Sequence, residues 1–105
     1  MTLAIFLLFP QSAMSQNTWI DYCEHWSEFA GIQMQLRQDG FPVRTAFQSV
    51  KDMAIALEFS DSEFEMAMKI TEFAFRRDLE PTQRLAEIAI YEFRDRFLVG
   101  CVSGQ

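Results

Sequence analysis

The side chains that could do covalent or metal chemistry are two cysteines, Cys23 and Cys101, and a single histidine, His25. The cysteines belong to no CxxC redox pair and no CxxCH haem attachment. An even count without such a motif favours a disulfide between them. The alternative is a catalytic Cys23 with His25 as its base. Residues two apart point to different sides of a helix, however, and this reading leaves Cys101 unexplained.

His25 also lies among carboxylates, which raises the possibility of metal chemistry. Asp21 and Glu28 are about one helical turn away, and Glu24 is adjacent. A zinc site takes three or four ligands, usually from more than one element, and a lone histidine on one helix supplies too few. We therefore expect a solvated acidic face without metal or cofactor, and metal binding or carriage by these residues is the weaker alternative.

The remaining sequence gives no indication of an enzyme. It contains neither a glycine-rich phosphate loop nor a GxSxG nucleophile elbow. The formal net charge is −6, and no basic stripe opposes it. Such a chain repels nucleic acid and anionic lipid surfaces. We expect a protein partner or self-association, and no nucleic acid.

Composition and periodicity indicate one all-α domain. The 105 residues are 50% hydrophobic, with only 4 Gly and 3 Pro. Apolar stripes at three-to-four spacing predict helices over Trp19–Gln38, Ala46–Leu57, a third stretch between Ser60 and Arg76, and Thr82–Cys101. Short connections between four helices predict a compact four-helix bundle-like domain. The Cys23–Cys101 disulfide would then close it between the first and last helices.

Each predicted helix has a start signal. The expected N-caps are Thr18, Thr45 with Gln48, Ser60 with Glu63, and Thr82. The third helix is apolar around most of its circumference and is expected to lie across the others. Its candidate groove for a partner comprises Phe64, Met66, Met68, Phe73 and Phe75. For the methionines we favour gap filling in a Phe-rich core, and we place a groove on this helix if one exists.

Residues 1–15 are typical of a secretory signal peptide, which leaves residues 16–105 as the single helical domain. Leu3–Phe9 is apolar, and the small residues Ala13 and Ser15 favour cleavage before Gln16. The run is too short for a stable membrane span. No basic residue precedes it, and the alternatives are a short core segment or a retained anchor. Export to the periplasm or medium agrees with a disulfide.

The motif spacing also resembles that of a known group. Cys23, the run Arg37-Gln38-Asp39-Gly40 with Pro42, and Phe93-Arg94 before Cys101 look like small exported helical proteins of bacterial, chiefly proteobacterial, and phage genomes. That group has no established function. The resemblance implies a disulfide-closed helical domain in the periplasm or outside the cell, and it carries over no catalytic or binding residues.

The function that these observations predict is an exported, non-enzymatic protein-binding or accessory module. A periplasmic interaction protein, an inhibitor and a chaperone-like protein all belong to this class. The alternative is a metal-binding or carrier protein that uses the acidic face around His25.

Overall fold

The computed structural model describes the backbone of residues 2–104 and the side chains of residues 17–104. This part of the chain folds into four helices: α1 (Thr2–Gln38), α2 (Val43–Ala56), α3 (Asp61–Arg76) and α4 (Gln83–Ser103). Cys23 and Cys101 form a disulfide, with their Cα atoms 5.7 Å apart. The all-α class and the bond between the first and last helices are therefore confirmed.

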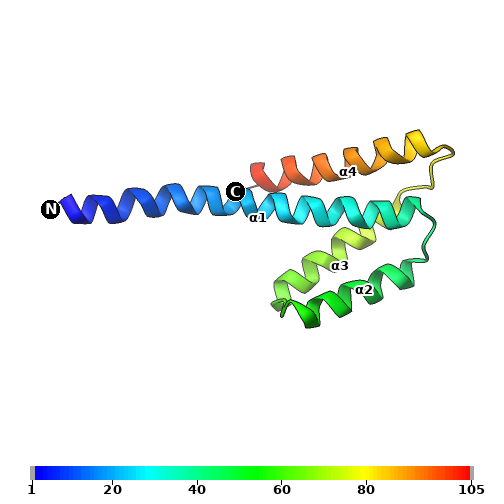
Figure 1. Ribbon diagram of the computed structural model, residues 1–105, viewed down its shortest axis with the longest axis horizontal. Helices are drawn as coiled ribbons and strands as arrows, with labels where there is room; N and C mark the ends of the chain where they lie inside the picture. The colour runs from blue at the N-terminus through cyan, green and yellow to red at the C-terminus, as the bar shows by residue number, and fades with distance from the viewer. Residues whose placement is uncertain (1, 105) are drawn as a thin grey trace.

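Helix α1 lies in the middle of the bundle (Figure 1). Helix α4 runs along one side of it and packs on it most closely, while α3 packs on the other side with α2 against its outer face. The expectation that the third helix lies across all the others is wrong. Its outward surface is charged and exposed at Glu65, Lys69, Glu72 and Arg76, so α3 is amphipathic and α1 is the helix with three neighbours.

The burial of α1 follows from its central place. The stripe predicted from the sequence is buried at Cys23, Trp26, Ala30 and Met34. The expected acidic face around His25 (Asp21, Glu24, His25 and Glu28) is exposed. The core cluster consists of Trp26, Phe29 and Ala30 of α1, Val50 of α2, and Ala67 and Ile70 of α3. Every member of this cluster lies on α1 or on the α2–α3 side of it.

Two of the predicted helix starts are confirmed. Ser60 and Glu63 form a reciprocal capping box, in which the Glu63 amide donates to Ser60 Oγ at 3.2 Å and the Ser60 amide donates to Glu63 Oε1 at 2.8 Å. At the start of α4, the Leu85 amide donates to Thr82 Oγ1 at 3.1 Å. These bonds satisfy backbone donors that have no partner inside the helix.

The other two predicted starts are wrong. Thr18 lies inside α1. Helix α2 begins at Val43, because Pro42 is its N-cap and the Pro42 carbonyl accepts from the Thr45 amide at 3.0 Å. The Gln48 amide group bonds to Asp52 at 3.1 Å instead of capping the helix. A proline fixed at φ −64° begins the helix without a side-chain cap.

The expected signal peptide, residues 1–15, is helical from Thr2, and its side chains lie outside the described residues. Its cleavage stays a prediction. Over the described part of the chain, no helix combines the length and the apolar character that crossing a membrane requires.

Candidate binding groove

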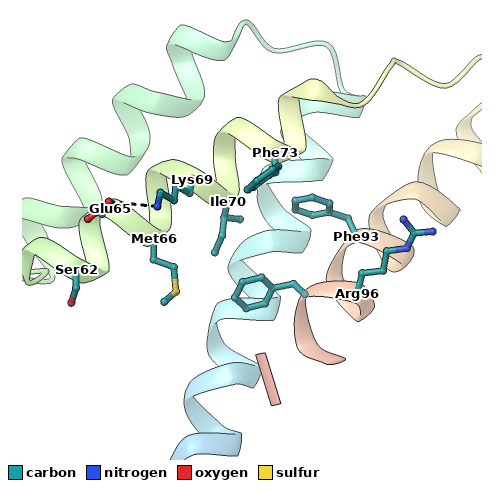
Figure 2. Close-up of a pocket in the computed structure, with 9 residues that line it drawn as sticks. Ser62, Glu65, Met66, Lys69, Ile70, Phe73, Phe93 and Arg96 are labelled. Atoms are coloured by element: carbon teal, nitrogen blue, oxygen red, sulfur yellow. Dashed lines mark ion pairs between the residues drawn. The ribbon is translucent and has the colours of Figure 1, made fainter. Parts of the chain in front are cut away.

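An apolar groove of about 680 Å³ lies between α3 and α4 (Figure 2). Met66, Ile70 and Phe73 form its α3 side, at the three-to-four spacing that puts them on one helical face. Phe93 and Phe97 form its α4 side at a spacing of four. We call these five side chains and the space between them the α3–α4 groove. It is lined by flexible and aromatic apolar groups, the kind that protein-binding surfaces use.

The edge of the groove is polar and exposed. On α3, Lys69 Nζ lies 3.5 Å from Glu65 Oε1, and both side chains are about two-thirds exposed, at 65% and 70%. On α4, Arg96 borders the groove and has no ion-pair partner among the described side chains. An apolar centre with a charged edge is the usual anatomy of a protein interface.

Helix α3 is fixed by packing. Ala67, Ile70, Thr71 and Ala74 are buried. The ring of Phe59, just before the capping box, lies 5.7 Å from the Trp26 ring between centroids. The α3 side of the groove therefore rests directly on the core.

Helix α4 lies along α1 and is also fixed at its two ends. Cys101, near its C-terminus, is bonded to Cys23, which is 0% exposed. Before its N-terminus, the connection 77–82 is bound by the last residues of α1. Arg37 Nε donates to the Arg77 carbonyl at 2.7 Å, and the Gln38 side chain accepts from the Glu80 amide at 2.9 Å and donates to the Asp78 carbonyl at 3.1 Å.

An ion-pair network reinforces this connection. Arg77 Nη2 lies 3.3 Å from Glu80 Oε1 and 3.1 Å from Glu92 Oε1. Glu92 thus pairs with Arg77 across the connection. These end contacts, together with the packing of both rings against the core cluster, place the groove side made by Phe93 and Phe97.

Of the five groove residues predicted on the third helix, Met66 and Phe73 line the α3–α4 groove. Phe64 and Met68 pack against the core cluster and do not line the groove, whereas Met66 does both. Phe75 lies on another side of α3, where the Arg37 guanidinium is 5.9 Å from its ring centroid. A helix presents one face to one neighbour, so residues adjacent in sequence are divided among different surroundings.

The sequence did not assign Phe93, Phe97 and Ile70 to the groove. Phe93 and Phe97 lie four residues apart on the last predicted helix, a spacing typical of a buried helical face. Both rings are half-buried and pack against the core cluster. The sequence contains no signal that these two rings also face a groove.

The acidic face around His25 is not assembled into a metal site. Asp21, Glu24, His25 and Glu28 are all exposed on α1. Among the side chains of residues 17–104, no group of three or more His, Cys, Asp or Glu is placed to hold a metal ion. The alternative of metal carriage gains no support from this geometry.

No protein-family model, no curated protein and no solved structure matches this chain. The resemblance to small exported helical proteins stays a prediction.

Proposed function

We propose that the protein is an exported, non-enzymatic module that binds an amphipathic helix of a partner protein in the α3–α4 groove. The observation that carries this proposal is an apolar surface between two helices that no other helix of the described chain covers. Helices α3 and α4 both pack on α1 but not closely on each other, and the apolar groove occupies the space between them. In a closed bundle a further helix would cover such a surface. Here α2 lies on the far side of α3 instead (Figure 1).

The dimensions of the groove support a helical ligand. Its α3 side extends from Ser62 to Phe73, which at about 1.5 Å per residue is roughly 16 Å, or three helical turns. A helix of this length with apolar side chains at i, i+3 or i+4, and i+7 matches the groove, as in known helix-in-groove recognition. Phe73, which is 56% exposed, would lose most of its water contact on binding and is the expected anchor.

Two further features support export. The disulfide is stable in an oxidising compartment. Residues 1–15 have the apolar run and the small residues of a cleaved leader. The expected product in the periplasm or medium begins at Gln16 and lacks the hydrogens of both thiols. Intact mass with and without reductant measures both, and a full-length product with free thiols would contradict export.

The binding proposal is tested by site-specific photo-crosslinking in living cells. A photoreactive phenylalanine analogue replaces Phe73 or, as a matched control, Tyr91. Both aromatic residues are 56% exposed, but only Phe73 lines the groove. We expect a crosslink from position 73 and not from 91, to an amphipathic helical segment of one partner.

Other results of this experiment would contradict the proposal. A crosslink to a second copy of the chain would replace the partner by self-association. Equal crosslinking from both positions, or none from either, would mean that the groove has no specific occupant.

A further inference from the structure

A second cleft, of about 530 Å³, lies where α1 turns into α2. The turn that forms it is fixed by backbone geometry. Gly40 has φ +86°, the Phe41 amide donates to the Leu36 carbonyl at 3.1 Å, and the Gly40 amide donates to the Arg37 carbonyl at 3.0 Å. This is the Schellman arrangement that ends a helix at a glycine. It sets Phe41 at the cleft, and Phe47 of α2 and Phe75 of α3 line it as well.

The charge in this cleft is positive and concentrated on one group. Arg76 and Glu72 line the cleft and pair with each other at 3.0 Å. Arg37 lines it too, and its Nε is bound to the Arg77 carbonyl at 2.7 Å. The Nη groups of Arg37 have no partner among the described side chains and carbonyls. One bound nitrogen and the ring of Phe75 orient the guanidinium, and its two remaining amino groups stay available.

The first turn of α2 borders the same cleft at Val43, and it contains no acidic residue. No acidic side chain of that turn therefore opposes the positive end of the α2 dipole. The charged side chains that line the cleft, Arg37, Arg76 and Glu72, sum to one positive charge in a chain whose net charge is −6.

We propose that this cleft binds a small monocarboxylate with an apolar body. The carboxylate pairs with the Nη groups of Arg37, since a guanidinium and a carboxylate match each other bidentately. The apolar body packs among Phe41, Phe47 and Phe75. The single positive charge of one available guanidinium balances the single negative charge of a carboxylate. It does not balance the higher negative charge of a phosphate ester. This site is separate from the α3–α4 groove and does not depend on the proposed function.

The test is a titration of the oxidised, folded protein followed by amide NMR. The probes are hydrocinnamate and octanoate, each compared with its neutral primary amide. We expect shifts at Phe41, Val43 and Phe75, and a Kd for the carboxylates about tenfold below that of the amides, the size of a charge-assisted hydrogen-bond contribution. The aromatic and aliphatic probes distinguish which apolar body the three rings prefer.

Three variants locate the effect. Arg37→Gln is expected to remove the preference for carboxylate over amide. Arg44→Gln removes the same charge from an exposed arginine in the first turn of α2 that does not line the cleft, and is expected to leave the preference unchanged. Phe41→Ala keeps Arg37 and its bond to Arg77, and should weaken each carboxylate and its amide alike, by several-fold.

The proposal is overturned if carboxylate and amide bind equally, or if neither shifts these amides at millimolar concentration. It is also overturned if Arg44→Gln weakens carboxylate binding as much as Arg37→Gln, because the effect would then be general electrostatic attraction.

Discussion

Helices α3 and α4 pack on opposite sides of α1, but different interactions hold them there. Helix α3 buries Ala67, Ile70, Thr71 and Ala74 among its 16 residues. Within α4, all 21 residues of which are described, Ala89 alone is buried. The longer helix therefore has fewer fully buried residues. Fully buried apolar packing holds α3, whereas α4 lies along α1 through a mostly half-buried face and is also tied by a covalent bond at one end and by polar contacts at the other.

This difference matters for the α3–α4 groove. Its α3 side is continuous with the core through Ile70. Its α4 side, Phe93 and Phe97, packs against the core cluster with half-buried rings, and the disulfide and the contacts of Arg37 and Gln38 with the connection 77–82 tie both ends of that helix. Because side-chain packing is cooperative and a disulfide can be removed chemically, the two sides of the groove can be separated by experiment.

Removal of the disulfide is expected to have the largest effect. The bonded cysteines are 78 residues apart, and the loop-entropy estimate for such a closure is about 4.5 kcal/mol of unfolding free energy, as an upper figure. In the double variant Cys23→Ala with Cys101→Ala, we expect hydrogen exchange to speed up first in α4. Exchange in α2 and α3 should change less. A uniform acceleration in all helices would contradict the separate anchoring of α4.

Truncation of an apolar side chain has the second-largest expected effect. Making it once in α3 and once in α4 compares the packing on the two sides of α1. Ile70 is 4% exposed, so Ile70→Ala should cost about 3 kcal/mol through the lost burial and the cavity that remains. Ile90 of α4 is only half-buried, and Ile90→Ala should cost about 1 kcal/mol. Chemical denaturation of both variants measures the two costs. Equal costs would show that α4 contributes as much packing as α3.

The polar anchor of α4 has a smaller expected effect. Gln38→Ala removes the acceptor of the Glu80 amide and the donor to the Asp78 carbonyl, which should cost about 1–2 kcal/mol because the bond from the Glu80 amide is partly shielded from water. The control is Gln48→Ala, which removes one exposed bond to Asp52 and should cost at most about 0.5 kcal/mol. If Gln38→Ala matches this control, the Gln38 bonds contribute nothing to the anchoring of α4.

The sequence predicted the positions of the helices better than it predicted which helices pack against each other. Three-to-four spacing identified the buried stripe of α1, and Ser60 with Glu63 located the start of α3. Periodicity shows which face of a helix is buried but not which helix covers it, so the position of α2 and the second side of the groove could not be predicted. Thr45 failed as a cap because Pro42 already begins the helix.

The spacing of charges within one helix also failed to predict an ion pair, because the actual partner comes from another part of the chain. Glu92 and Arg96 have the spacing of a favourable pair within one helix. The structure pairs Glu92 with Arg77 at 3.1 Å instead. Arg77 is brought there by the anchored connection, a tertiary feature that no local pattern encodes. Arg96 consequently lies at the edge of the groove, a position that local charge spacing does not predict.

The smallest expected effect concerns the middle of the α1–α4 contact. Gly31 is buried in α1, and a Cβ added there would lie 3.5 Å from Arg94 Cδ, an ordinary contact with a flexible side chain. Because alanine is a better helix former than glycine, Gly31→Ala should raise the unfolding free energy by about 0.5–1 kcal/mol.

Gly100→Ala is the control for this prediction, since its added Cβ would meet nothing within 4 Å. Thermal or chemical denaturation should show a similar gain for both variants if the contact of α4 with α1 at Gly31 accommodates an added methyl group. If Gly31→Ala destabilises the protein while Gly100→Ala stabilises it, the close approach of the two helices at Gly31 is itself a packing anchor. The contrast between α3 and α4 would then be one of degree.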